Sequence, residues 1–339
     1  MHPDSGATTS LWMDSASLPT YPALTDNAEC EVCVVGAGIA GLTTAYLLAL
    51  EGQKVIVIDD GQIGSGETSR TTAHLSNEID DRYVEIARVH GSENARIAAS
   101  SHTAAIEFIE SFARENKVDC DFTRLDGYLF LAEGDTQDVL DDEHDAARLA
   151  GLVVEKLDRA PLASFDTGPC LRFPNQARFH PLRYLSAMAE AFVQAGGRIF
   201  CGTHVKNTES KDGTITVTIE KPEVKVTAQQ LVVCTNSPIH DLFAMHTKQA
   251  PYRSYVVAAR VPRGTVTLKC VAPGSSLSGA KKTPCVPIQR HFPATSAPSS
   301  VRTESGGMRG DSSSSVRIAR LKSTVTPGSA RFSTVPRGP

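Results

Sequence analysis

A strand, a glycine-rich turn, a helix and a second strand follow one another without interruption in residues 32–60, and this order constrains the fold of the 339-residue chain more than any other feature. The β-branched run at 32–35 leads directly into Gly36-Ala37-Gly38-Ile39-Ala40-Gly41. Apolar residues then recur at helical spacing until Gly52, and a second apolar strand at 55–58 ends on Asp59. The pattern predicts one βαβ unit of a parallel sheet.

Each part of this unit suits the binding of a dinucleotide. Gly36 would make the tight turn, Gly38 would let the backbone approach a pyrophosphate, and Gly41 would let the helix pack close to the strand. The helix amino terminus, with its unpaired N–H groups, would then face the phosphates, which places Ile39 and Ala40 beside them. Asp59, followed by Asp60, stands where a carboxylate accepts hydrogen bonds from a ribose hydroxyl. The fingerprint by itself serves FAD and NAD equally.

The segment after Asp59 favours FAD. Residues 64–75, GSGETSRTTAHL, are rich in glycine and small hydroxyl residues. In a flavoprotein such a loop leads from the ribose toward the isoalloxazine, and Arg70 suits a phosphate or a ribose hydroxyl. We therefore predict flavin contacts at Thr68, Ser69, Arg70, Thr72, Ala73 and His74. The alternative interpretation is an ordinary polar surface loop.

Three further segments support a family resemblance. Together with the βαβ unit, the sequences GSGETSRTTAHLS, HPLRY at 180–184 and LVVCTN at 231–236 resemble the FAD-dependent amine and amino-acid oxidase superfamily, the D-amino-acid-oxidase-like group. The similarity covers about residues 10–263 and looks greatest to the branch that often carries a Rieske iron–sulfur domain. The resemblance implies FAD as cofactor, with Val205 near the adenine and Thr235 and Asn236 near the flavin. It also implies oxidation of a C–N bond in an amine or amino acid by hydride transfer to flavin N5.

The predicted fold class is α/β, with a Rossmann-like FAD-binding domain, a β-meander and an inserted α+β substrate domain. The domains are expected at 28–80 with 176–244 for FAD and at 81–175 with 245–263 for the substrate side. Periodicity predicts helices over 82–116, broken near Gly91, over 136–149 and over 181–194, and strands between 198 and 234. Residues 165–173, punctuated by Pro and Gly, are predicted to form a loop.

Substrate contacts are predicted in the segment before Arg263. Tyr252, Arg253 and Tyr255 are the candidates, because a guanidinium pairs with a carboxylate and tyrosines can line an amine pocket. The candidate catalytic residues are Tyr255 and His74, whose imidazole would stabilise a reduced flavin. A structural role for each of them is the competing interpretation.

Composition changes after residue 263. Residues 264–339 contain 14 Ser, 8 Pro and 8 Gly and carry a net charge of +9, whereas the preceding residues carry −13. Such a segment cannot bury enough apolar surface to offset its ordering entropy, so we predict disorder. We interpret the abrupt change as a gene-model artefact, which would leave a truncated, inactive flavin pocket. A basic tail also suits nucleic acid or anionic membranes, but it lacks interleaved aromatics, and we expect neither partner.

The remaining features bear on the compartment and on residues 1–27, which are predicted to form an extended arm anchored by Trp12, the only tryptophan. The chain shows no basic-then-apolar leader, so we expect a cytoplasmic protein. Cys30 and Cys33 form a CxxC, but i and i+3 on a strand point to opposite faces, so the thiols should diverge. No zinc spacing or Rieske CxH…CxxH pattern occurs, and no metal site is predicted.

Two other functions remain open from the sequence. One is a non-catalytic fragment that binds a nucleotide. The other is an NAD(P)-linked dehydrogenase or a flavin monooxygenase, which would call for a second nucleotide fingerprint where this chain has one GxGxxG. The particular amine, the electron acceptor, the mode of FAD attachment and the oligomeric state do not follow from the residues.

Overall fold

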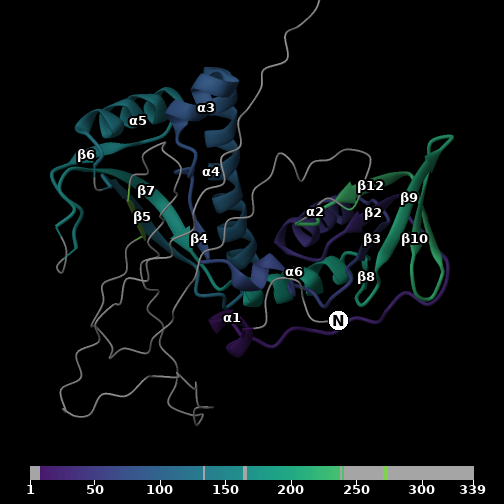
Figure 1. Ribbon diagram of the computed structural model, residues 1–339. Coiled ribbons are helices and arrows are strands. Elements are labelled where there is room, and N and C mark those ends of the chain that lie inside the picture. Colours follow the sequence, from purple (N-terminus) through teal and green to yellow (C-terminus); the bar gives the residue numbers. More distant parts are fainter. Residues whose placement is uncertain (1–7, 133, 163–165, 237–238, 240–269, 274–339) are drawn as a thin grey trace, which may run out of the picture. The chain divides into compact units, whose positions relative to one another are not determined.

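A parallel sheet forms the centre of the predicted nucleotide-binding region (Figure 1). The computed structural model describes residues 8–132, 134–162, 166–236, 239 and 270–273. The sheet order is β12-β2-β3-β8, with all neighbours parallel, and the strands are β2 (Val32–Val35), β3 (Val55–Ile58), β8 (Arg198–Phe200) and β12 (Gln230–Val233). Strands β2 and β3 are buried along their whole length, as expected when both faces of a parallel sheet are covered.

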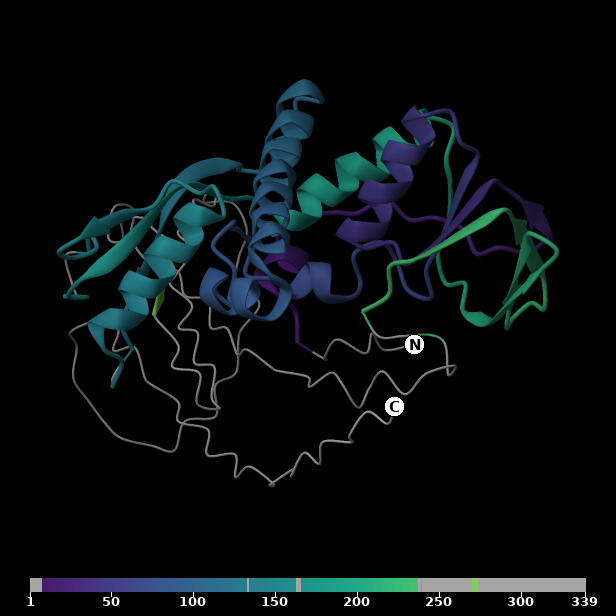
Figure 2. The same ribbon diagram turned by 90° about the horizontal axis from the view of Figure 1, so that it is seen from above.

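The two faces of this sheet are covered by different layers (Figure 2). Val34 and Val57 point into one core with helices α2 (Ile39–Leu50) and α6 (Pro181–Gln194), which contact each other. Val35 and Ile58 alternate with them and point into a second core. That core is closed by a second sheet in the order β1-β11-β10-β9, made of Ala28–Glu29, Lys225–Ala228, Thr214–Ile219 and Val205–Lys211. The Rossmann-like α/β class with a β-meander is confirmed.

Helix α6 begins and ends where its sequence predicts. Pro181 occupies the first turn, where a missing N–H costs nothing, and His180 caps the helix by accepting a hydrogen bond from Arg183 N at 3.4 Å. The helix stops before Gly196, whose φ is +90°. The last turn packs so closely on the following chain that a Cβ at Gly197 would lie 2.1 Å from the Phe192 ring.

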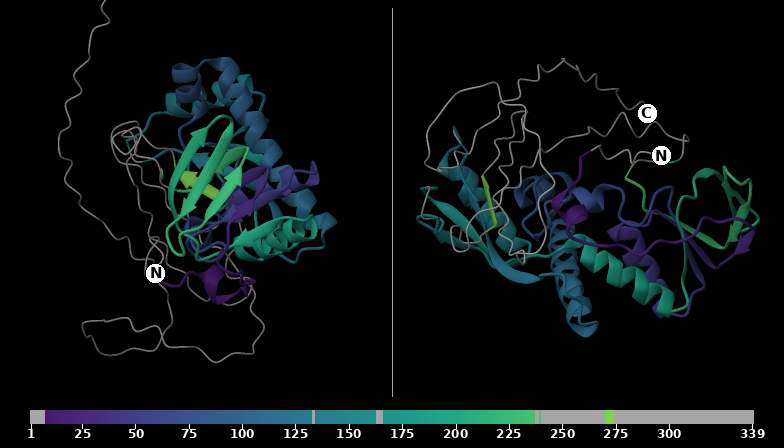
Figure 3. Two further views of the ribbon diagram at one scale, coloured as in Figure 1. Left: turned by 90° about the vertical axis from the view of Figure 1, so that its right-hand side faces the viewer. Right: turned by 90° about the horizontal axis from the view of Figure 1, so that it is seen from below.

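A third sheet, in the order β13-β5-β7-β4 with β6 beside β7, brings segments together from distant parts of the sequence (Figure 3). Its strands are β4 (His74–Leu75), β5 (Thr123–Phe130), β6 (Glu155–Leu157), β7 (Cys170–Arg178) and β13 (Cys270–Pro273). Helices α3 (Tyr83–His90), α4 (Ser92–Glu115) and α5 (Gln137–Leu149) pack with it around Leu129, Leu171 and Phe173. Gly91, at φ +86°, separates α3 from α4, as predicted.

A buried polar network fixes the chain that follows β4. Gln176, 1% exposed, accepts hydrogen bonds from Asn77 N at 2.7 Å and Ser76 Oγ at 2.9 Å, and it donates to Asn77 Oδ1 at 2.7 Å. Asn77 Nδ2 in turn donates to Thr103 Oγ1 on α4 at 3.0 Å. Because the polar atoms of this network are paired, it joins β4, β7 and α4 without the cost of unsatisfied buried groups.

Two local expectations differ from the structure. Strand β7 starts at Cys170, inside the segment predicted as a loop. Hydrogen bonding to β5 and β6 makes these residues extended, although the Pro and Gly residues nearby are typical of a loop. Residues 270–273 pair in parallel with β5 instead of being disordered; the remainder of the predicted tail lies outside the described residues. The domain boundaries stay predictions, although β4 and the end of β7 pair within the third sheet.

The two thiols of the CxxC meet, so the prediction that they diverge is wrong. Glu31 N and Val32 N both donate to Lys54 O, at 2.9 and 3.2 Å. Two residues therefore share one position of the ladder, as in a β-bulge, and the alternation of side chains is broken. Cys33 donates a hydrogen bond to Cys30, which lowers the pKa of Cys30 and raises that of buried Cys33.

Short elements complete the described chain. Helix α1 (Leu11–Asp14) and the 3₁₀ turn η1 (Glu67–Arg70) contact each other, and α1 also contacts α6. Trp12, 5% exposed, anchors this part of the chain as predicted. Among the described helices, none combines the length and the apolar character needed to cross a bilayer.

Candidate dinucleotide-binding site

The turn between β2 and α2 has no room for side chains at two of its three glycines. Gly36 has φ +110°, and a Cβ there would lie 2.7 Å from Cys234 O. A Cβ at Gly41 would lie 1.8 Å from Gly36 O. Gly36 is therefore required by the backbone conformation, and Gly41 by the close approach of α2 to the end of β2.

The amino terminus of α2 is formed by Gly38, which has no side chain to cap it. Thr68 comes from η1 to this point, and its Oγ1 accepts a hydrogen bond from Ile39 N at 3.1 Å. The same Oγ1 would lie 3.2 Å from a Cβ at Gly38. Ala40 is exposed in the first turn. A twelve-residue helix thus directs its positive end toward a threonine hydroxyl from the loop predicted to contact the flavin.

Asp59 ends β3 and holds the glycine turn from the side. Its Oδ2 accepts from Ala37 N at 2.6 Å, and its Oδ1 accepts from Gly61 N at 2.8 Å. Burial raises the pKa of this carboxyl, and the two backbone hydrogen bonds oppose that shift. Each carboxylate oxygen has a second lone pair, so both keep the capacity to accept from a ribose hydroxyl.

The connection from β8 to β9 lies beside Asp59. Thr203 N donates to Asp59 O at 2.8 Å, and Thr203 is 1% exposed. Val205, two residues later, begins β9 and is half-buried against the core shared with the meander. Asp60 is exposed, with its Oδ2 3.6 Å from His204 Nδ1. The predicted ribose and adenine residues therefore lie along one stretch of backbone.

The loop residues after Thr68 lie in different environments. Ser69 is 1% exposed and its Oγ donates to Gly66 O at 2.9 Å, so this hydroxyl serves the loop itself. Arg70 Nη1 donates to Thr8 O at 2.8 Å. Thr72 is half-buried, and Ala73 is buried with φ +62°. This backbone conformation is uncommon for a residue other than glycine and is found at functional turns.

His74 is paired across the ladder with Arg178, the last residue of β7. Burial lowers the pKa of His74, and the neighbouring guanidinium lowers it further, so the neutral imidazole is favoured. Burial also lowers the pKa of Arg178. Its Nε is buried and has no hydrogen-bond partner within the part of the chain that the structure describes.

The segment after β12 meets the glycine turn. Cys234 N donates to Val35 O at 2.8 Å, and Thr235 N would lie 3.4 Å from a Cβ at Gly36. Thr235 is half-buried and Asn236 is exposed. The predicted substrate residues Tyr252, Arg253 and Tyr255 lie outside the described residues.

The carboxyl edge of the parallel sheet therefore offers a cradle that fits FAD. It combines a glycine-rich turn, the amino-terminal turn of α2, an acid at the end of β3 and a hydroxyl-bearing loop. These groups match a pyrophosphate and a ribose. The assignment of individual contacts stays a prediction.

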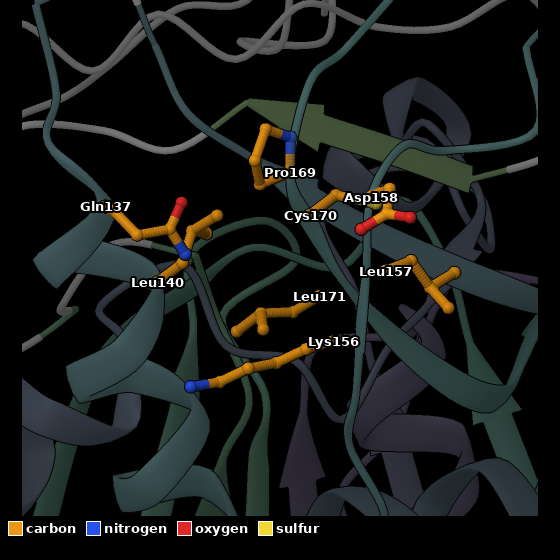
Figure 4. A pocket seen from close by; sticks show the side chains of 8 residues that line it. All are labelled: Gln137, Leu140, Lys156, Leu157, Asp158, Pro169, Cys170 and Leu171. Carbon is orange, nitrogen blue, oxygen red and sulfur yellow. The ribbon is translucent and has the colours of Figure 1, made fainter.

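A separate hollow of about 250 Å³ lies on the third sheet (Figure 4). Its walls come from α5, β6 and β7 and their flanks, and they include Lys156, Leu140 and Leu171. None of its lining residues belongs to the glycine turn, to η1 or to the end of β3. The Lys156 ammonium is already paired with Asp141 at 2.6 Å. We therefore do not assign the hollow to the dinucleotide.

Several residues of the site could not be found from sequence patterns. Ala37 supplies the N–H that holds Asp59, and Thr203 supports Asp59 from the other side. Ser10 and Trp12 contact the loop from about sixty positions earlier in the chain. The single tryptophan was the one sequence feature that pointed to the arm. Backbone N–H groups give no such indication, because every residue except proline carries one.

Comparison with known proteins agrees with this architecture. The family model described as "FAD dependent oxidoreductase" (DAO) matches residues 31–283, a stretch that extends past Arg263, where the sequence resemblance was expected to stop. A Bacillus subtilis protein named as a Rieske 2Fe-2S iron–sulfur protein, YhfW, is 32% identical over 250 residues, which are 74% of this chain and 48% of that protein. Gamma-glutamylputrescine oxidoreductase of Escherichia coli is 27% identical, over 65% of this chain and 52% of that protein. The chain thus spans about half the length of these relatives.

Solved structures show the same fold. L-proline dehydrogenase from P. horikoshii aligns with a TM-score of 0.50 at 20% identity, over 62% of this chain and 54% of that one. L-amino acid deaminase from Proteus myxofaciens aligns with a TM-score of 0.50 at 16% identity, over 63% and 46%. The family match covers most of the chain and includes the whole glycine turn. The chain belongs to the DAO family of FAD-dependent oxidoreductases, and its cofactor is FAD.

Proposed function

We propose that this chain provides the FAD-binding part of an oxidoreductase that oxidises the C–N bond of an amine or amino acid. The observation that carries the proposal is that Asp59 bonds to Ala37 N in the glycine turn and Thr68 to Ile39 N in the first turn of α2, so that both flank the amino terminus of this helix. When bound, FAD would supply the oxidising power as the hydride acceptor. The protein's part is to bind the nucleotide, orient the substrate and exclude water.

Asp59 is proposed to hold both the glycine turn and the ribose of the nucleotide. Through Ala37 N it orders the glycine turn, and through its remaining lone pairs it would accept the ribose hydroxyls. Thr68 is proposed to place its hydroxyl at the pyrophosphate, next to Ile39 N. His74, kept neutral by burial and by Arg178, is proposed to lie at the flavin end of the loop.

The proposed substrate carries a carboxylate, and Arg178 supports this choice over a plain amine. Its guanidinium is half-buried, with Asp121 as the acid that acts on its pKa, and its Nε has no partner among the described residues. An anionic substrate group would supply that partner. Replacing Arg178 by Leu should raise KM for an amino acid more than for the matching decarboxylated amine. Equal changes for the two substrates would count against a carboxylate.

The central experiment measures FAD binding to the purified full chain. Apoprotein is titrated with FAD, and wild type is compared with Asp59→Asn, which keeps the shape and loses the charge. Glu31→Gln is the matched control, because Glu31 Oε2 also accepts a backbone hydrogen bond, from Lys54 N at 2.6 Å, at the opposite end of β3. We expect about tenfold to a hundredfold weaker FAD binding for Asp59→Asn, the loss of roughly two charge-assisted hydrogen bonds. Equal affinities of the two variants would refute the site.

Turnover is tested separately with amines and amino acids. Peroxide formation is followed for an oxidase, and reduction of an artificial acceptor dye for a dehydrogenase. FAD binding without turnover of any substrate would favour the non-catalytic nucleotide-binding fragment. Binding of NAD(P) in place of FAD would favour the nicotinamide-linked alternative.

A further inference from the structure

We propose that residues 8–15 hold the loop 66–73 in its FAD-binding conformation, with Trp12 as the central positioning residue. This inference rests on the proposed function, since it assigns that loop to the flavin. The arm consists of α1 and the residues on either side of it. The loop consists of η1 and the residues up to Ala73.

Three hydrogen bonds tie the arm to the loop, and two of them are accepted by the loop backbone. Ser10 Oγ donates to Ser69 O at 2.6 Å, and Trp12 Nε1 donates to Thr71 O at 2.8 Å. In the other direction, Arg70 Nη1 donates to Thr8 O at 2.8 Å. Alternate carbonyls of the loop are therefore satisfied by a segment 59 residues away. Release of the arm would leave the carbonyls of Ser69 and Thr71 without these hydrogen-bond donors.

The arm is itself held against a rigid helix. Trp12 is 5% exposed, and its ring centroid lies 5.1 Å from that of His180, at an interplanar angle of 58°. Ser15 Oγ lies 3.1 Å from His180 Nε2. His180 is fully buried and caps α6 through its Nδ1. Trp12 therefore connects the start of α6 to the loop. Helix α1, which carries Trp12, lies beside α6 (Figure 1).

The position of the loop matters at the nucleotide. Thr68 immediately precedes Ser69, whose carbonyl Ser10 holds, and Thr68 Oγ1 is the group that reaches Ile39 N on α2. A release of Ser69 and Thr71 would remove the restraint on Thr68 and on the left-handed residue Ala73. FAD binding would then have to order the loop, and the entropy lost in doing so would lower the affinity for FAD.

Binding is measured on full-length apoprotein by FAD titration. Trp12→Phe keeps the packed ring and removes the N–H donor, and we expect about a fivefold rise in Kd for FAD. Trp12→Ala should raise Kd at least tenfold. Phe192→Leu is the control. Phe192 is fully buried in the same core, on α6, and its ring has no group that could form a hydrogen bond to the loop. This variant should lower stability and leave Kd within twofold.

Two readouts report on the loop without FAD. Tryptic cleavage after Arg70 should become at least fivefold faster in Trp12→Phe and Ser10→Ala, relative to cleavage after Lys211, an exposed site at the end of β9. In Ser10→Ala the single tryptophan remains as a reporter, and its emission should shift to the red as the arm detaches.

The outcomes separate this inference from the proposed function. If wild type binds FAD, and Trp12→Ala and Phe192→Leu bind it equally well or are weakened equally, the positioning role of the arm is refuted. If wild type binds no FAD, the proposed function fails, and the tryptic rate after Arg70 alone decides whether the arm clamps the loop. Unchanged cleavage in both Trp12→Phe and Ser10→Ala overturns the clamp. Should Trp12→Ala fail to fold, Trp12→Phe and Ser10→Ala carry the test.

Discussion

Replacing Gly41 with Ala tests how closely α2 must approach β2. The added Cβ would lie 1.8 Å from Gly36 O, a backbone atom that no side-chain rotation can move aside. Ordinary carbon–oxygen contacts need more than 3 Å, so the helix or the turn must shift by more than an ångström. Overpacking of this kind costs about 1–3 kcal/mol, and we take the upper end because the obstacle is backbone.

The opposing term is helix propensity, which favours Ala over Gly by about 1 kcal/mol. The expected net loss is therefore about 2 kcal/mol in the free energy of unfolding, or roughly a thirtyfold smaller folding constant. With a urea m-value of roughly 2–3 kcal/mol/M, the midpoint should fall by about 0.7–1 M. FAD affinity should also fall, because the turn that moves is the one proposed to bind the pyrophosphate.

Urea unfolding of the apoprotein, followed by circular dichroism, measures this loss. Gly66→Ala is the control for stability, since nothing lies within 4 Å of its Cβ position. A Gly41→Ala midpoint within about 0.2 M of wild type would show that the turn yields at little cost, and would refute the argument that close packing requires glycine here.

Two other perturbations test the buried polar groups. Gln176→Leu should lower the free energy of unfolding by about 3 kcal/mol, because it leaves Asn77 N–H buried without its acceptor, and a urea midpoint equal to that of wild type would contradict this. His74 has a pKa below its ordinary value, so the folded state resists protonation while the unfolded state does not. The stability from its neutral form is present above the unfolded pKa near 6.5 and is lost as pH falls through that value toward the folded pKa. The His74→Gln variant should therefore lose less stability than wild type when the pH is lowered from 7.5 to 5.5. His90→Gln, at an exposed position, is the control. Equal losses in His74→Gln and wild type would show that His74 does not contribute.

Much of the nucleotide-binding fold follows from local patterns. The glycines at 36, 38 and 41, the apolar strands beside them and the acid at 59 lie within one short stretch, so their spacing predicted their relative positions. Helix α6 was equally predictable from the sequence, because Pro181 and Gly196 mark its limits. Strand β7 was not, since Cys170 to Phe173 become a strand through pairing with β5 and β6, residues that lie many positions earlier.

What the sequence determined by itself is therefore the βαβ unit and the family to which it belongs, because turn geometry and helical period act between near neighbours. Only the tertiary structure decided that Asp59 holds Ala37, that Cys30 meets Cys33 and that Trp12 lies on the loop at Thr71. Asp59 and Trp12 bond to backbone groups 22 and 59 residues away, and the contact between the two cysteines depends on the bulge where Glu31 and Val32 share Lys54 O. These contacts form when packing brings the segments together, and no local pattern of residue types encodes that proximity.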